Sequence, residues 1–334
     1  MILVTGGTGL VGAHLLFKLV NENKNVRAIY RNKNKFKNTK AVFSCYTDNV
    51  DAVFNKIEWV EANILDIPAL TEAYKNVKFV YHCAAFVSFE PNKYYALKKS
   101  NIEGTSNMVN LALANNIEKF CYVSSIATLG DELKNKKITE DSIYNPEADN
   151  SVYAITKYGG EMEVWRATQE GLNAVIVNSG LVIGPGIWHY GTGSFFKRAK
   201  KGISYYTSGT VGIVAVTDVV SVMIKLMESK ISKERYILVA ENWTYKNFLI
   251  TLAKAVQAKP PKKVAKPWLL NMLWRLDWLL TKFTGKRRQL TKHLVQSLTT
   301  ETFYSSNKIK KALNYEFKAI NETITSVGNA YVKD

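Results

Sequence analysis

Tyr153 and Lys157 have the residue types and the spacing for proton transfer. Residues four apart on a helix share one face, so the Lys157 ammonium can lower the pKa of the Tyr153 phenol from its usual value of about 10. The same ammonium can reach a ribose hydroxyl. A hydroxyl from Ser125 could hold a carbonyl oxygen while Tyr153 supplies its proton. These residues predict acid–base chemistry on a carbonyl or an alcohol.

Spacing alone does not identify this pair, because the chain has five tyrosines followed four residues later by a lysine. The pairs are Tyr74/Lys78, Tyr94/Lys98, Tyr95/Lys99, Tyr153/Lys157 and Tyr304/Lys308. Only Tyr153 opens a predicted helix shortly after a strand that ends in paired serines. Gly159 and Gly160 on that helix allow a close approach, so position selects Tyr153.

A glycine-rich turn near the beginning of the chain would position the partner of this chemistry. Ile2 to Val4 are typical of a buried strand, Gly6, Gly9 and Gly12 follow, and apolar residues from Ala13 to Val20 recur with a helical period. A strand, turn and helix in this order bring backbone N–H groups to the positive end of a helix dipole, which suits a dinucleotide pyrophosphate. A purely steric role for the glycines is the alternative.

Arg31 follows the second predicted strand, 26–30, where an acidic residue usually binds the diol of an adenine ribose. A guanidinium can instead bind a 2′-phosphate through paired, charge-assisted hydrogen bonds. Arg31 therefore favours NADP(H), with NAD(H) as the alternative cofactor. Alternatively, Arg31, Lys33 and Lys35 form only a solvated turn.

Two further strand ends carry candidate residues. Asp66 follows the third predicted strand, where it could bind the adenine amino group or cap the next helix. Ala84 and Ala85 follow the fourth strand and are small enough to let a cofactor lie against the backbone. His82 is interpreted as a packed core histidine, and since no second ligand stands at a suitable spacing, we expect no metal.

Strand-like and helix-like segments alternate over the first 180 residues, which is typical of an α/β fold with a doubly wound parallel sheet. We expect a Rossmann-type nucleotide-binding domain from residues 1–178 with 213–239. Residues 179–212 with 240–334 would form a smaller C-terminal substrate-binding lobe over the carboxyl edge of the sheet.

Composition limits the partners and the compartment. The chain has 45 Lys and Arg against 28 Asp and Glu, a net charge of +17, but no basic run is interleaved with aromatic residues. We therefore expect a solvated basic surface and no nucleic-acid partner. Three widely spaced cysteines predict no disulfide framework. A first strand that begins at Met1 leaves no room for a signal peptide, so the expected location is cytoplasmic.

The segment from Trp268 to Phe283 has a broad apolar face at helical spacing, with Asn271, Arg275 and Lys282 opposite. We interpret it as a cap over the substrate lobe or an oligomer contact. Peripheral contact with an anionic membrane is the alternative.

Eight motifs occur in one order along about two thirds of the chain: TGGTGLVG at 5–12, LDI at 65–67, HCAA at 82–85, NIEGTSN at 101–107, YVSSIATLG at 122–130, YAITK at 153–157, GLVIGPG at 180–186 and VTDVV at 216–220. The chain thereby resembles the extended short-chain dehydrogenase/reductases, also called NAD-dependent epimerase/dehydratases. VRAIYR at 26–31 and the GPG passage are most similar to dihydroflavonol-reductase-like and 3β-hydroxysteroid-dehydrogenase-like members.

The resemblance implies a catalytic triad of Ser125, Tyr153 and Lys157, with Ser125 chosen because it stands five residues before Gly130. It also implies a homodimer and a cofactor site made of Gly6, Thr8, Gly9, Leu10, Val11, Gly12, Arg31, Asp66, Ile67, Ala84, Ala85, Tyr153, Lys157 and Val182. One departure is Asn178-Ser179, where the family usually has a proline before the glycine.

The leading hypothesis is an NADP(H)-dependent oxidoreductase acting on a ketone, an aldehyde or a secondary alcohol. A nucleotide-sugar epimerase with tightly bound NAD is the alternative, and Arg31 counts against it. A non-catalytic dinucleotide sensor is a third hypothesis, opposed by the intact Ser/Tyr/Lys set. We expect the substrate to contact Phe86, Ser88, Ser125, Asn178 and Trp188, although aromatic residues at such places could instead pack the lobe.

Overall fold

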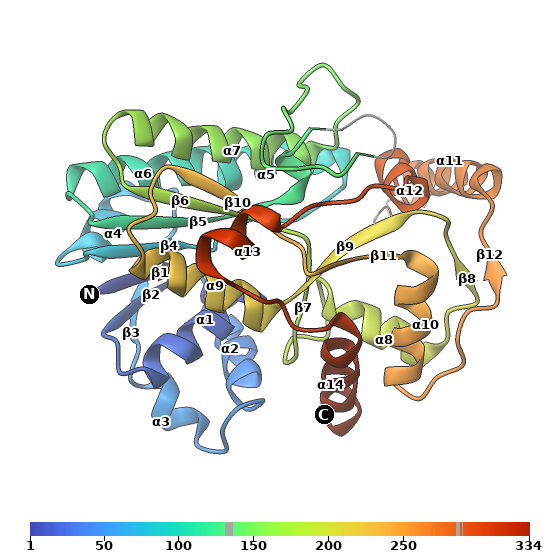
Figure 1. Ribbon diagram of the computed structural model, residues 1–334, viewed down its shortest axis with the longest axis horizontal. Helices are drawn as coiled ribbons and strands as arrows, with labels where there is room; N and C mark the ends of the chain where they lie inside the picture. The colour runs from blue at the N-terminus through green and yellow to red at the C-terminus, as the bar shows by residue number, and fades with distance from the viewer. Residues whose placement is uncertain (131–135, 285–287, 289) are drawn as a thin grey trace.

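A sheet of seven parallel strands forms the centre of the computed structural model, which describes residues 1–130, 136–284, 288 and 290–334. The strand order is β10-β6-β5-β4-β1-β2-β3 (Figure 1). The strands are β1 (Ile2–Thr5), β2 (Val26–Tyr30), β3 (Glu58–Glu61), β4 (Phe79–His82), β5 (Lys119–Ser125), β6 (Ala174–Ser179) and β10 (Glu234–Leu238). The predicted doubly wound parallel fold is confirmed.

Helices cover both faces of this sheet and bury one apolar core on each side. On one face lie α1 (Leu10–Asn21), α2 (Phe36–Phe43), α3 (Val50–Phe54) and α9 (Val216–Glu228). On the other lie α4 (Ile67–Tyr74), α5 (Tyr94–Lys98), α6 (Gly104–Ala114) and α7 (Val152–Gln169). A π-helical turn, Lys99–Glu103, joins α5 to α6.

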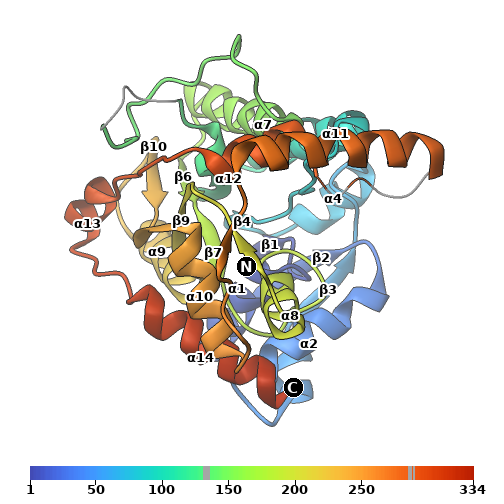
Figure 2. The ribbon, with the colours of Figure 1, turned by 90° about the vertical axis from the view of Figure 1, so that its right-hand side faces the viewer.

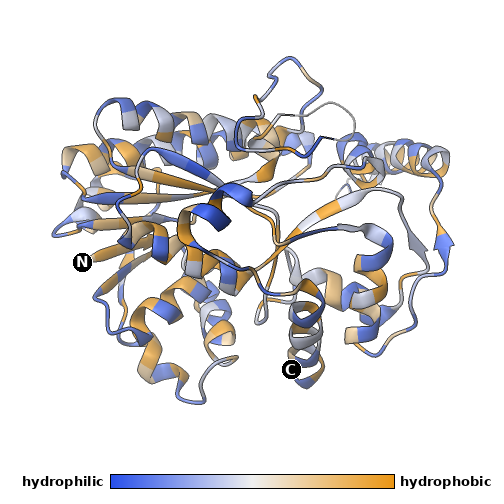
Figure 3. Cartoon of the chain, in the orientation of Figure 1, coloured by the Kyte–Doolittle hydropathy of each residue, from blue (hydrophilic) through white to orange (hydrophobic). Residues whose placement is uncertain are grey.

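Local sequence explains why these elements begin and end where they do. The central strands are apolar runs, as the orange strands of Figure 3 show, and every residue of β6 is buried. Asn23, Asn76, Asn116 and Asn314 follow α1, α4, α6 and α13 (Asn307–Leu313) with a positive φ. Asparagine tolerates this left-handed conformation better than most residues, so it ends a helix cleanly.

A second unit is built on a three-stranded sheet of β7 (Leu181–Ile183), β9 (Thr210–Ala215) and β11 (Glu241–Thr244). It shares an apolar core with α8 (Gly193–Lys201), α10 (Tyr245–Ala255) and α14 (Ile320–Lys333). Two short strands, β8 (Tyr205–Tyr206) and β12 (Lys263–Val264), lead to α11 (Pro267–Thr284) and α12 (Lys292–Thr299). Figure 2 shows α11 and α12 at one end of the molecule.

The strand order sets the place of the site. β1 pairs with β2 on one side and with β4 on the other, so the chain turns in opposite directions after β1 and after β4. In such sheets a crevice opens at the carboxyl ends of these two strands. The glycine turn follows β1, and Cys83 to Ala85 follow β4, so both predicted cofactor segments meet there.

Candidate active site

The glycine turn after β1 packs its backbone so closely that two positions have no room for a side chain. Gly6 has φ +70°, and a Cβ there would lie 2.7 Å from the backbone nitrogen of Ala84. A Cβ on Gly12 would collide with the carbonyl oxygen of Gly6. Gly9 caps α1 and donates its N–H to the Gly6 carbonyl at 2.9 Å.

This packing begins α1 directly at the crevice. The first N–H groups of a helix have no partner within it, so those of Leu10, Val11 and Gly12 are directed toward the carboxyl edge of the sheet. Thr8 completes the turn, and its carbonyl accepts hydrogen bonds from Asn38 Nδ2 at 3.4 Å and from the Tyr190 hydroxyl at 3.3 Å. A cradle of backbone N–H groups fits a pyrophosphate.

A basic pocket adjoins the turn. It has a volume of about 250 Å³ and is lined by Thr8, Arg31, Asn32 and Lys35. The Asn32 side chain accepts a hydrogen bond from the Asn34 backbone at 2.9 Å and so caps the short 3₁₀ turn Lys33–Lys35. Two cations thus share one pocket at the end of β2, which fits a phosphate on an adenine ribose.

Asp66 has the helix-capping role that the sequence left open. Its Oδ1 accepts the backbone N–H of Ala69 at 3.1 Å, at the beginning of α4. Leu65 and Ile67 beside it are 38% and 54% exposed, and they form an apolar ledge at the same edge of the sheet. Contact between Asp66 or Ile67 and an adenine ring stays a prediction.

The end of β4 is fixed by a buried chain of polar groups. The Thr5 hydroxyl lies 2.7 Å from His82 Nδ1 and accepts the backbone N–H of Ala84 at 3.1 Å, while His82 Nε2 lies 3.1 Å from the Thr105 hydroxyl. Burial, together with the charge of Lys157, lowers the pKa of His82 to about 3. His82 is therefore a neutral core histidine, as predicted, and it aligns the β4 end with the glycine turn.

Tyr153 lies in the first turn of α7, and Ser151 caps that helix by accepting the Ala154 N–H at 3.1 Å. Burial raises the pKa of Tyr153, and a hydrogen bond with Ser125 partly offsets this. The structure thus brings Tyr153 and Ser125 together. The predicted lowering of the Tyr153 pKa is wrong for this geometry, because desolvation outweighs the other influences on the phenol.

Lys157 lies one turn further along α7 and is turned toward β5. Its Nζ donates to the Tyr122 hydroxyl at 2.7 Å and to the Val123 carbonyl at 2.9 Å. The residue is only 2% exposed, and burial lowers its pKa to about 7, although the neighbouring Glu161 and Cys83 oppose that shift. The Lys157 side chain is therefore bound to β5 and shielded from solvent.

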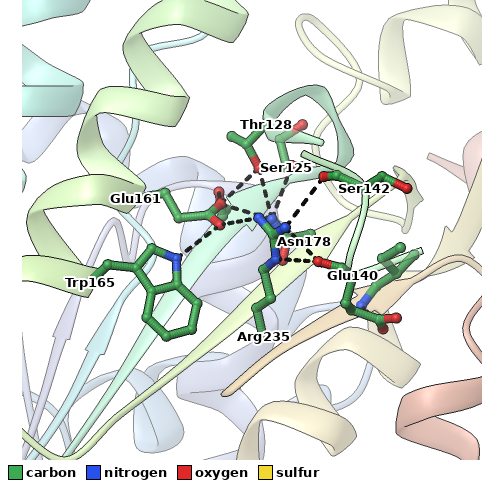
Figure 4. A network of polar contacts seen from close by, with 10 residues as sticks. Ser125, Thr128, Glu140, Ser142, Glu161, Trp165, Asn178 and Arg235 are labelled. Carbon is green, nitrogen blue, oxygen red and sulfur yellow. Dashed lines mark hydrogen bonds and ion pairs between the residues drawn. The ribbon is translucent and has the colours of Figure 1, made fainter. Parts of the chain in front are cut away.

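Glu161 lies one further turn along the same face of α7 and is fully buried. Figure 4 shows its carboxylate at the centre of a polar network. It accepts hydrogen bonds from the Ser124 hydroxyl at 2.6 Å, the Thr128 hydroxyl at 2.7 Å, Asn178 Nδ2 at 2.8 Å, Arg235 at 3.1 Å and Trp165 Nε1 at 3.4 Å. The Arg235 guanidinium also donates to the Glu140 carbonyl at 2.9 Å. Sequence reasoning missed this network.

The network decides which serine faces the crevice. Ser124 pairs in register with Asn178, and both bind Glu161, so Ser124 is 3% exposed. Ser125 is the next residue, and successive side chains of a strand point to opposite faces, so it is left partly exposed beside Tyr153. This arrangement supports the choice of Ser125 over Ser124.

Asn101, which the sequence placed only within a motif, holds the loop that follows β4. It exchanges two hydrogen bonds with the Phe86 backbone, at 2.8 and 3.0 Å, and donates to Thr156 on α7 at 3.2 Å. It lies within the π-helical turn, a feature frequent at functional sites. The loop it holds carries Phe89, whose ring lies 5.3 Å from the Tyr153 ring, edge to face.

Three of the predicted substrate residues are placed as packing groups. Asn178 is fully buried, and its amide nitrogen binds Glu161 and Thr128. Trp188 is partly buried, packs on Tyr331 and donates to the Asp334 side chain at 2.6 Å, at the surface of the second unit. Ser88 is 5% exposed and accepts the N–H of Glu90. Asn178 and Ser88 are buried and Trp188 is partly buried, and contact of these three residues with a substrate stays a prediction.

Two further observations bear on ligands. Val182 lies on β7 and packs against the main core. Within the part of the chain that the structure describes, no three His, Cys, Asp or Glu side chains are grouped to hold a metal ion.

Comparison with known proteins places this geometry in a family. The model of the NAD dependent epimerase/dehydratase family matches residues 2–239. A protein of Synechocystis sp., provisionally named a dihydroflavonol 4-reductase, is 27% identical over 99% of this chain and 95% of its own. Sterol demethylase protein B of Methylococcus capsulatus is 24% identical, over 93% and 92% of the two chains.

Solved structures agree in fold. The crystal structure of gox2253 has a TM-score of 0.82 and 25% identity, covering 100% of this chain and 98% of the other. UDP-glucose 4-epimerase of Thermotoga maritima, solved with UDP-glucose, has a TM-score of 0.77 and 20% identity, covering 99% and 98%. At such identities the likeness to the epimerase supports the shared architecture alone.

The Glu161–Arg235 pair yields a prediction about stability. Glu161→Gln leaves the Arg235 guanidinium, whose side chain is only 16% exposed, without its counter-charge, and we expect the free energy of unfolding to fall by about 3 kcal/mol. Arg235→Met should cost a similar amount. The double variant leaves neither charge of this pair without its partner. Its loss of unfolding free energy should therefore be smaller than the summed losses of the two single variants by more than about 1 kcal/mol. Urea denaturation measures all three.

Glu163→Gln is the matched control. Glu163 makes the same kind of pair with Arg166, at 3.1 Å, but on the surface of the same helix. Its loss should stay below about 1 kcal/mol. Additive losses in the Glu161/Arg235 double variant would contradict the coupling.

Proposed function

The chain belongs to the NAD-dependent epimerase/dehydratase family, and we propose that it is an NADP(H)-dependent oxidoreductase that acts on a ketone, an aldehyde or a secondary alcohol. The observation that carries the proposal is the position of Tyr153 beside Ser125, at the crevice where the glycine turn begins α1. The relatives named as reductases agree with this class of reaction.

The preference for NADP(H) rests on the basic pocket. Arg31 and Lys35 line it together with Thr8 of the glycine turn, so one ligand can contact the backbone cradle and both cations. A 2′-phosphate carries the negative charge that these cations complement, whereas a plain ribose does not. The apolar ledge of Leu65 and Ile67 would then face the adenine ring.

Each residue of the triad has a distinct role in the reaction. The bound nicotinamide supplies hydride to the carbonyl carbon. Tyr153 donates a proton to the carbonyl oxygen, and its raised pKa keeps the phenol protonated until that oxygen gains charge. Ser125 donates a hydrogen bond to the same oxygen and fixes its position. In the oxidative direction it is the phenolate form of Tyr153 that accepts the proton from the alcohol.

Lys157 supports Tyr153 from behind. Its Nζ is bound to the Tyr122 hydroxyl and the Val123 carbonyl at the carboxyl end of β5, from where it would anchor a ribose hydroxyl of the cofactor. Within the proposed division, residues 1–178 with 213–239 bind the cofactor and residues 179–212 with 240–334 enclose the substrate. Phe86 and Phe89, at the rim beside Tyr153, favour an apolar or aromatic substrate.

Arg31→Asp tests the cofactor preference. It replaces a charge-assisted donor by a repelling carboxylate, so we expect the Kd of NADPH to rise by roughly 10- to 100-fold while that of NADH changes little. Nucleotide fluorescence titration measures both. Lys33→Asp makes the same charge change two residues away but outside the pocket lining, and it should spare NADPH. Equal losses for the two nucleotides, or for the two variants, would remove the assignment.

Tyr153→Phe tests the chemistry. Without the phenol, kcat for NADPH oxidation with a panel of aromatic and aliphatic carbonyl compounds should fall by about 10²- to 10⁴-fold. The Kd of NADPH should stay within a few-fold. Tyr158→Phe is the matched control on the same helix, because Tyr158 stacks on Tyr144 instead. Unchanged turnover in Tyr153→Phe would rule out the mechanism.

A further inference from the structure

Helix α11 carries an exposed apolar face of seven side chains: Trp268, Met272, Leu273, Leu276, Leu279, Leu280 and Phe283, which are between 41% and 79% exposed. At about 100° per residue, these positions fall within an arc of about 140°. No charged residue lies within this arc. We call this surface the α11 face.

The opposite side of α11 is its contact with the rest of the chain. Leu270 is buried there with Ala265 and Val295. Asp277 is also turned inward, and its Oδ2 accepts the backbone N–H of Leu290 at 2.9 Å. α11 therefore packs on the rest of the chain through Leu270 and Asp277, while the α11 face stays exposed, as does Trp278 outside it, at 48%.

The sequence on both sides of α11 is strongly basic. Residues 259–300 contain ten basic residues, Lys259, Lys262, Lys263, Lys266, Arg275, Lys282, Lys286, Arg287, Arg288 and Lys292, against Asp277 as the only acid. Arg275 and Lys282 border the α11 face. Their charged ends lie 4.8 Å from the Trp274 ring centroid and 5.6 Å from that of Trp278.

We propose that α11 lies in the interface of an anionic lipid bilayer, with the α11 face in the acyl region and its basic border among the headgroups. Arginine and lysine stems beside an apolar face can extend their charges to headgroup phosphates, and indole rings favour the same depth. Anionic lipids attract basic segments of this kind. In the described residues no helix has the length and apolarity to cross a membrane, so this contact is peripheral.

Charge favours a lipid surface over a second copy of the chain. A two-fold interface places the same patch on both subunits, so the basic borders of two α11 helices would face and repel each other. Asp277 is turned inward to the Leu290 N–H and would not neutralise them. An anionic headgroup layer provides the complementary charge over the whole border.

The docked helix would lie next to the candidate active site. Lys292 and His293 of α12 lie 2.7 and 3.7 Å from Asp149, two residues before the cap of α7. A mostly apolar hollow of about 650 Å³ lies between α11, α12 and Pro91, and Met272, Leu276 and Leu279 of the α11 face line one side of it. The proposed membrane contact therefore lies close to α7, the helix that carries Tyr153. The proposal of membrane binding does not depend on the proposed reaction.

Vesicle flotation of the full chain tests the proposal. The chain should float with vesicles of phosphatidylcholine and phosphatidylglycerol, much less with phosphatidylcholine alone, and less as salt rises. Leu276→Glu with Leu280→Glu should lower the bound fraction by about tenfold or more, because two charges would enter the acyl region. Ile143→Glu with Val332→Glu, two exposed apolar residues elsewhere, makes the same change and should leave binding as it is.

Arg275→Gln with Lys282→Gln is a second variant, which alters only exposed charges. It should reduce binding to the anionic vesicles and leave binding to phosphatidylcholine vesicles unchanged. Unfolding midpoints show whether each variant is folded. Failure of the native chain to float would overturn the proposal. So would equal flotation of the Leu276/Leu280 variant, which would show adsorption through the general basic charge. If the native chain is a dimer that does not float, and the Leu276/Leu280 variant is a monomer, the α11 face would instead be the contact between two copies of the chain.

Discussion

The buried carboxylate of Glu161 is the constraint on which the site depends. A fully buried charge is tolerated only when it is paired and hydrogen-bonded, and this one draws its partners from β5, β6, β10 and the turn after β5. The ends of those strands are therefore fixed relative to α7. Tyr153, Lys157 and Glu161 occupy successive turns of that helix, so the network that satisfies Glu161 also sets where Tyr153 meets Ser125.

The other half of the site is built from backbone. Gly6 and Gly12 leave no space for side chains, and Thr5 and His82 align the end of β4 with the turn. A rigid cradle of N–H groups lies on one side of the crevice and a rigid pair of hydroxyls on the other. In the proposed function, a cofactor held by the backbone cradle would face this pair of hydroxyls.

Local features of this site could be predicted from sequence, and features that join distant segments could not. The glycine turn, the helix that carries Tyr153 and Lys157, and the parallel sheet depend on short motifs and hydrophobic periodicity, and the structure contains all three. Arg235 is 74 residues from Glu161, and nothing in a single sequence joins them. Polarity and aromaticity also do not reveal that Asn178 is buried against Glu161 or that Trp188 packs on Tyr331. Likewise, the amphipathic pattern of α11 predicted a helix but not that its apolar side is exposed.

The central claim is that the crevice takes up NADP(H) reversibly for hydride exchange with an external substrate. The most direct measurement is to denature the purified chain, release any nucleotide it carries and identify it by chromatography and mass spectrometry, then titrate NADPH into the native protein. Our account predicts a substoichiometric, exchangeable nucleotide and saturable uptake of NADPH. Stoichiometric, tightly held NAD would contradict it, because an enzyme that removes and returns the same hydride retains its cofactor.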